Sequence, residues 1–198
     1  MQPARRQLVR EFSPAELSAM RLDGELFSLA GGYLACDEPD VLATRVGLVL
    51  ASAPSGLRDG LFIVDRLSAA WAWGALTVAP EPAELCCDVA ARSRTAFRGH
   101  PVHQVRLRSG DVLRTAAGPV LSRWRTIVHL LRWPPTETTA ELAQMIGVLL
   151  AGCGLTVAEA RERLRREHVP SQAGRLIPEL ERICLPLSGQ PAAQISCR

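Results

Sequence analysis

Arginine is the residue type in this chain with the clearest capacity for binding chemistry. All 23 basic residues are arginines and none is a lysine. Each guanidinium is a planar, permanently charged fork that suits phosphates, carboxylates and the edges of nucleic-acid bases. A GC-rich coding sequence explains this bias by itself, because Ala, Gly and Pro are frequent too. The guanidinium chemistry is the same whatever the origin of the bias.

Several arginines are candidates for phosphate contacts because they cluster in an N-terminal arm, a short helix, a loop and one face of a strand. The candidate DNA contacts are Arg5, Arg6, Arg10, Arg21, Arg92, Arg94, Arg106 and Arg108. Side chains two apart on a strand share a face, which would pair Arg106 with Arg108. Contacts of this kind release counterions and make binding depend on salt. Each cluster is also open to interpretation as a solvated surface.

Catalytic and metal-binding patterns are missing from the sequence. It contains no Gly-x-Ser-x-Gly, P-loop, His-Glu-x-x-His or Gly-x-Gly-x-x-Gly motif. Cys86 and Cys87 are adjacent, and their spacing from His100 and His103 does not match that of zinc-finger ligands. We therefore expect a non-catalytic protein with no metal and no cofactor.

Composition limits the class of protein. The chain has 198 residues, 47% of them hydrophobic, and a formal net charge of +3. It is long enough to bury a core and too apolar to be disordered. No apolar run reaches the roughly 18 residues that a membrane span needs. Because no apolar stretch follows the charged N-terminus, we expect no secretory signal, no membrane partner and a cytoplasmic location.

The elements that must position these side chains follow from local patterns. Ser13 and Glu16 form a capping box around Pro14, which predicts a short helix over 14–23. Apolar runs on either side of Gly31-Gly32 then predict a β-hairpin with one of those glycines at its tip. Further along the chain, the patterns predict helices over 37–51 and 67–74, the second of them capped by Asp65. They also predict strands between 61 and 121, and helices over 122–132, 137–151, 157–168 and 172–184.

The predicted fold is therefore mixed α/β. A partial winged helix-turn-helix piece at the N-terminus precedes an α/β domain with a helical C-terminus. We place the boundaries at 1–52 for the winged-helix-like region, 57–185 for the α/β domain and 186–198 for a flexible tail. Two tryptophans that lie two apart on a helix cannot both face the core. With Trp71 in the core, we predict a partner surface at Trp73, Arg123 and Arg125.

Several short motifs, taken in order, resemble the AbiEi family of antitoxins from abortive-infection toxin–antitoxin systems, as found in actinobacteria. The motifs are Phe12–Leu17, Asp23–Leu26, Leu29–Tyr33, Ser68–Gly74, Val102–Leu107, Gly118–Val120 and Arg123–Val128. The resemblance covers about residues 12–132, and His129 stands where the family pattern has an acidic residue. It implies a transcriptional regulator that binds promoter DNA and neutralises a nucleotidyltransferase-like toxin. A protein-interaction module on the same scaffold, without DNA binding, is the alternative.

A cytoplasmic location has a consequence for the six cysteines, which lie at 36, 86, 87, 153, 184 and 197. A reducing compartment keeps thiols free. Alkylation in denaturant, without added reductant, should therefore add six modifications when the freshly lysed protein is weighed by mass spectrometry. A disulfide in that material would contradict the expectation.

Overall fold

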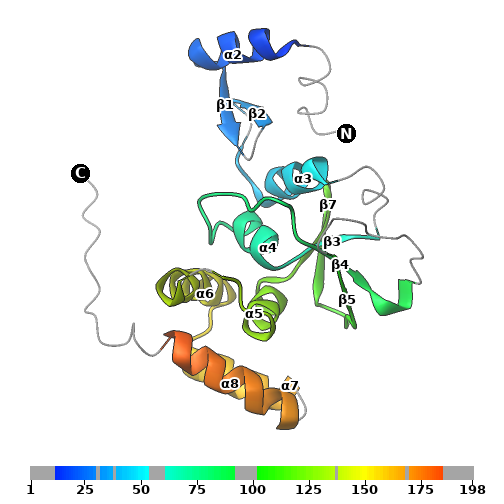
Figure 1. Cartoon of the computed structure of the whole chain (residues 1–198), viewed down its shortest axis with the longest axis vertical. Coiled ribbons are helices and arrows are strands. Elements are labelled where there is room, and N and C mark those ends of the chain that lie inside the picture. Colours follow the sequence, from blue (N-terminus) through cyan, green and yellow to red (C-terminus); the bar gives the residue numbers. More distant parts are fainter. Residues whose placement is uncertain are drawn as a thin grey trace. The chain divides into compact units, whose positions relative to one another are not determined.

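The computed structural model describes residues 12–29, 32–37, 39–53, 61–91, 102–136, 138–167 and 170–184. The chain divides into two compact units, with unit 1 ending at Ser122 and unit 2 beginning at Arg123. Unit 1 combines helices with two sheets, and unit 2 contains helices (Figure 1). The mixed α/β prediction is confirmed. The boundary between the units falls inside the range predicted as a single α/β domain, 57–185, and the predicted domain limits stay a prediction.

The described part of unit 1 begins with a helix and a hairpin, as predicted. Helix α2 (Pro14–Leu22) starts at the Ser13 cap, where the Glu16 carboxylate accepts from the Ser13 N–H and the Ser13 hydroxyl accepts from the Glu16 N–H. Strands β1 (Leu26–Leu29) and β2 (Gly32–Ala35) pair antiparallel, with Leu29 opposite Gly32. Gly32 therefore lies within a strand, while Gly31 lies outside the described residues. A complete winged helix is not established by these elements.

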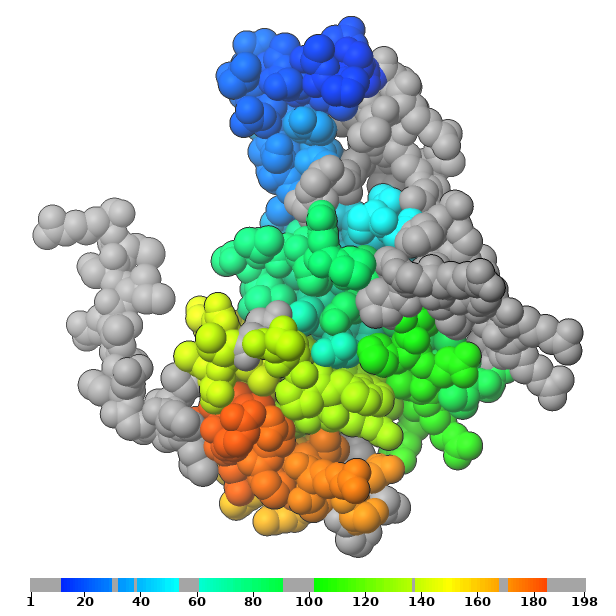
Figure 2. All heavy atoms as spheres, in the orientation of Figure 1, coloured from blue at the N-terminus to red at the C-terminus, as the bar shows by residue number. Residues whose placement is uncertain are grey.

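The hairpin joins α2 to the body of unit 1. Phe27 lies opposite Leu34, so these side chains share one face, and together with Leu29 they belong to the main core of unit 1. Leu26 points to the opposite face and is buried there, and α2 packs against β1. The hairpin is thus held between α2 and the body of unit 1, as Figure 2 shows from the blue α2 to the cyan α3.

The body of unit 1 is a five-stranded sheet in the order β5-β4-β3-β7-β6. Its strands are β3 (Ile63–Val64), β4 (Leu85–Asp88), β5 (Val102–Val105), β6 (Val112–Thr115) and β7 (Gly118–Leu121), with a 3-10 turn, η2, at Val89–Ala91. Strand β3 pairs antiparallel with β4 and parallel with β7. Helix α3 (Leu42–Ser52) packs on β3, β6 and β7 and on α4 (Arg66–Ala72).

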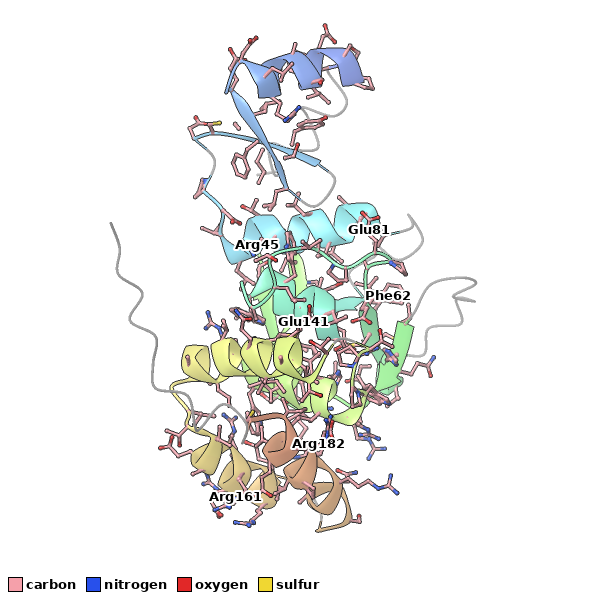
Figure 3. The ribbon with its side chains drawn as sticks, turned by 60° about the vertical axis from the view of Figure 1, so that its left-hand side comes forward. Arg45, Phe62, Glu81, Glu141, Arg161 and Arg182 are labelled. Atoms are coloured by element: carbon pink, nitrogen blue, oxygen red, sulfur yellow. The ribbon has the colours of Figure 1, made fainter. Side chains whose placement is uncertain are left out.

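Arg45 links the two helices of this layer (Figure 3). Its guanidinium forms a bidentate pair with Asp40, at 2.6 and 2.7 Å, and donates to the Trp71 carbonyl at 2.9 Å. It also lies 5.1 Å from the centre of the Trp71 ring. Hydrogen bonding to Arg45 lowers the pKa of Asp40. The ring of Trp71 is fully buried, as the sequence predicted for one of the two tryptophans.

Unit 2 consists of α5 (Arg123–Arg132), α6 (Thr139–Cys153), α7 (Val157–Glu167) and α8 (Pro170–Cys184), close to the predicted ranges. Capping boxes at Thr138 and Thr156 start α6 and α7. Glu167 joins α7 to α5, because its carboxylate accepts from the Trp124 indole at 2.7 Å and from Arg163, on its own helix, at 2.6 Å. Arg182 on α8, labelled in Figure 3, bonds Glu179 and reaches Thr139 at 3.4 Å.

The cysteines differ in their surroundings. The five in the described residues are free thiols, with Cys36 exposed and Cys86, Cys87 and Cys184 buried. Cys197 lies outside the described residues. Burial raises the pKa of the Cys87 and Cys184 thiols, so these two are poor nucleophiles near neutral pH.

The packed hairpin leads to a stability prediction. Leu34 is fully buried in the main core of unit 1, so Leu34→Ala should lower the free energy of unfolding by about 2–5 kcal/mol. Ser28→Ala changes an exposed side chain of the same hairpin and should cost within about 0.5 kcal/mol. Urea unfolding followed by circular dichroism measures both. Equal midpoints for the two variants would mean that the hairpin is only appended to the core.

Candidate functional site

The helix–hairpin of residues 12–37 is the first candidate surface for nucleic acid. Arg21 is exposed in the last turn of α2, as a phosphate contact must be. Asp23 ends this helix, and Gly24 follows with a φ of +79°, a left-handed conformation that favours glycine. The Cys36 thiol donates to the Gly24 carbonyl at 2.9 Å and ties the end of the hairpin to this turn.

The charge of this segment does not favour phosphate. Residues 12–37 carry a single arginine, Arg21, against four carboxylates, those of Glu16, Asp23, Glu25 and Asp37. All five of these side chains are exposed. Phosphate contacts require an excess of cationic donors. By itself, this segment therefore lacks the excess positive charge that phosphate contacts need.

The other predicted arginines fall into two groups. Arg5, Arg6, Arg10, Arg92 and Arg94 lie outside the described residues. Arg106 and Arg108 are exposed, but β5 ends at Val105, so the predicted shared strand face is wrong. The chain turns there instead: the Arg108 N–H donates to the Asp111 carboxylate at 2.8 Å, and Gly110 has a φ of +88°. The chain forms a tight turn here rather than a longer strand, because Asp111 and Gly110 stabilise the turn locally.

The residues of the predicted partner surface have internal contacts as well. Trp73 caps the C-terminal end of α4, and its half-buried indole N–H donates to the Leu121 carbonyl at 2.8 Å. Arg123 and Arg125 begin unit 2, both partly buried, and Arg123 donates to the Gly152 carbonyl at 3.3 Å. Trp73 and Arg123 are therefore committed in part to contacts within their own units, and Arg125 is half-buried. The exposed parts of all three side chains stay candidate contacts.

A polar cluster at the corner between β3 and α4 was not anticipated from the sequence as a whole. Asp65, predicted as a helix cap, is fully buried and accepts from the Arg66 N–H at 2.6 Å. The Arg66 guanidinium lies 3.1 Å from the Glu84 carboxylate and 3.4 Å from His103 Nε2. The second Glu84 oxygen accepts from the Leu67 N–H at 2.8 Å. The cluster therefore joins α4 to the beginnings of β4 and β5.

Backbone strain marks the same corner. Arg66 has a φ of +43°, a left-handed conformation that is costly for a residue with a Cβ. The strain persists because neighbouring groups fix this residue at both its N–H and its guanidinium. The sequence carried one signal for the corner, the Asp65 cap. The pairing of Arg66 with Glu84, 18 positions away, and the approach of His103 required the fold.

Comparisons with known proteins do not assign a family. No protein-family model matches the chain, and no curated protein matches it significantly. Within the described residues, no group of three His, Cys, Asp or Glu side chains is arranged to hold a metal ion. No single described helix is long and apolar enough to cross a membrane; α6 and α7 pass that test only as a pair bent by 79°.

The corner cluster gives a testable ranking of variants. Glu84→Ala removes both the partner of the Arg66 charge and the acceptor for Leu67, and both side chains of that pair are only 13% exposed. We expect a loss of about 3–5 kcal/mol in the free energy of unfolding. Glu84→Gln keeps an acceptor oxygen and should cost clearly less, because fewer buried groups lose their hydrogen bonds.

Glu81→Ala is the matched control, since Glu81 is exposed on the preceding loop and its removal should cost within about 0.5 kcal/mol. Urea unfolding of the three variants tests the ranking. If Glu84→Gln were as damaging as Glu84→Ala, the carboxylate's charge rather than its hydrogen bonds would hold the corner.

Proposed function

We propose that this chain is a non-catalytic, antitoxin-like transcriptional regulator that binds promoter DNA through its N-terminal region and neutralises a nucleotidyltransferase-like toxin. The observation that carries the proposal is the helix followed directly by a hairpin, α2–β1–β2, which is the order at the end of a winged helix. The ordered motifs that resemble the AbiEi family add to it. In such an arrangement α2 takes the place of the recognition helix.

Charge distribution decides where the DNA contacts must lie in this proposal. The described residues of unit 1 carry six arginines against ten carboxylates, an excess of negative charge. Phosphate affinity therefore falls to the arm with Arg5, Arg6 and Arg10 and to Arg92 and Arg94, with Arg21, Arg106 and Arg108 assisting. In this scheme the acidic α2–hairpin approaches DNA only because the arm brings it there.

The second candidate function is a protein-interaction module that binds no DNA. The four exposed carboxylates on residues 12–37 favour it, because such a surface attracts a basic protein and repels phosphates. A gene for a nucleotidyltransferase-like protein beside this one would support either a regulator or a module that engages a toxin. Only DNA binding separates the two candidates.

The deciding experiment is a fluorescence anisotropy titration of DNA from upstream of the chain's own gene, across a salt series. Log affinity should fall with log salt at a slope near −0.9 for each phosphate neutralised. Replacing Arg5, Arg6 and Arg10 with alanine should weaken binding and flatten that slope by about 1 to 3 units. Replacing Arg106 and Arg108 should change the slope less.

A matched control removes three positive charges elsewhere. Arg132, Arg166 and Arg175 are exposed on the helices of unit 2 and form no ion pair with a described residue. Their triple alanine variant has the same net charge as the arm variant and should retain the wild-type slope. If wild-type protein shows no preference for its own upstream DNA over random duplex, the proposal of a DNA-binding regulator is wrong. The protein-interaction module then becomes the better account of the function.

A further inference from the structure

Helix α6 in unit 2 has an outward face that is uncharged along most of its length. The exposed residues of this face are Ala140, Gln144, Gly147, Val148 and Ala151, and Val148 is 43% exposed. We call these five residues the α6 face. Positions 140, 144, 147 and 151 follow one another at intervals of four, three and four residues, which sets them in one line along the helix. Two helices that pack side by side meet along a seam with this spacing.

The two glycines inside α6 differ in the reason for lacking a side chain. A Cβ on Gly152 would lie 2.7 Å from Cδ and Nε of Arg123, so this glycine makes room for the guanidinium that donates to its carbonyl at 3.3 Å. A Cβ on Gly147 would meet no atom within 4 Å. Glycine destabilises a helix interior relative to alanine, and no neighbour of Gly147 in the described chain requires it. Its place on the α6 face allows another helix to approach closely from outside.

We propose that the α6 face packs antiparallel on the α6 face of a second copy of the chain, with the two-fold axis level with the middle of the helix, between positions 145 and 146. Gln144 then lies opposite Gly147 of the second copy, and Ala140 lies opposite Ala151, each twice by symmetry. The longest side chain of the face meets the residue that has none, and alanine meets alanine. A two-fold contact requires such a self-complementary surface. The inference concerns assembly and does not depend on the proposed function.

Charge selects a second copy as the occupant and antiparallel as the orientation. Glu141, the one charged residue of α6, lies in its first turn (Figure 3), and the Arg123 guanidinium lies over Gly152 in its last turn. Positions 141 and 152 are about three turns apart and therefore on the same flank of the α6 face. The antiparallel pair brings each Glu141 to Arg123 of the other copy, which forms two ion pairs at once. A parallel pair would place both carboxylates at one end and both guanidiniums at the other.

The Glu141 carboxylate can make this contact without losing its role as a helix cap. Its Oε2 atom accepts from the Thr138 N–H at 3.0 Å and from the Thr138 hydroxyl at 2.8 Å. No described residue donates to its Oε1 atom. Hydrogen bonding to Thr138 lowers the pKa of Glu141, so the carboxylate is charged at neutral pH. Each copy therefore offers an exposed anion near one end of the face and a cation near the other.

Sedimentation equilibrium of the full-length chain tests the contact. Wild type should contain dimer at roughly 100 µM, because a single helix pair is a small interface. Gly147→Ala places a methyl group where Gln144 of the second copy packs, so the dimer dissociation constant should rise at least about fivefold. The same change should raise the urea midpoint of the dilute monomer, because alanine favours a helix. Gly174→Ala is the matched control: Gly174 is exposed on α8 with the same open space, so only the midpoint should rise.

The ion pairs are tested by removing one charge from each copy. Glu141→Gln keeps an acceptor for the capping box but loses both pairs with Arg123, so the dissociation constant should rise about two- to tenfold. Glu159→Gln is its control, because Glu159 has the same position in the capping box of α7, is also exposed and lies outside the α6 face. Its dissociation constant should match that of wild type.

Cysteine cross-linking with a short bis-maleimide tests the orientation. In the proposed register the two copies of position 144 are about 4.5 Å apart along the helix axis, and those of position 140 are about 16 Å apart. Gln144→Cys should therefore form a cross-linked dimer, and Ala140→Cys should not. Wild type under the same conditions gives the background from the native thiols, including the exposed Cys36.

Three results would overturn the proposal. The first is a wild type that is entirely monomeric at roughly 100 µM. The second is a Gly147→Ala variant that dimerises as tightly as wild type or as the Gly174→Ala control, which would place any dimer contact elsewhere. The third is equal cross-linking at positions 140 and 144, which would exclude the antiparallel register. Because Gly147→Ala should stabilise the monomer, a weaker dimer in that variant is not explained by unfolding.

Discussion

The carboxylate of Glu84 is the group on which the architecture of unit 1 depends most. One oxygen neutralises Arg66 and the other accepts the Leu67 N–H at the start of α4. Through these contacts a single side chain fixes where β3 ends, how α4 leaves the sheet and where β4 begins. A buried ion pair adds little net stability over an apolar pair of similar size, because desolvating both charges is costly. Its value here is that only one arrangement of the corner satisfies both partners.

That corner also shows the limits of reading structure from sequence. Helices were predictable where the signals are local, such as the capping boxes at Ser13, Thr138 and Thr156. Hairpins were predictable where short apolar runs flank glycine. The contacts of Arg66 with Glu84 and His103 were not predictable, because they join residues far apart in the sequence. The positive φ of Arg66 was not predictable either, because it depends on those contacts. The prediction that Arg106 and Arg108 share a strand face was wrong for the opposite reason. A local turn at 108–111 follows β5, which ends at Val105, so neither arginine lies on the strand.

The sequence predicted exposed arginines at the candidate site, but it did not predict that carboxylates on the same helix outnumber them. Counting arginines along the chain draws attention to clusters of positive charge, and Arg21 is exposed as such an interpretation requires. The count misses the carboxylates that the fold places on the same element, because Glu16 caps α2 and Asp23 ends it. Residues that serve as helix caps thereby set the charge of the surface. Structural and functional demands on this helix conflict, and the basic arm is the part of the sequence able to offset that conflict.

The packing of the hairpin bears on how such a protein would work. Phe27 and Leu34 place one face of the hairpin in the main core of unit 1, and α2 packs against β1. A wing without core contacts could move independently of the body, but a hairpin whose Leu34 is fully buried in that core cannot shift without opening it. In the proposed regulator, DNA held by the N-terminal arm is therefore positioned by the same packed core that carries the sheet. Val120 of β7 belongs to the same core, so the hairpin and the five-stranded sheet share one set of packed side chains.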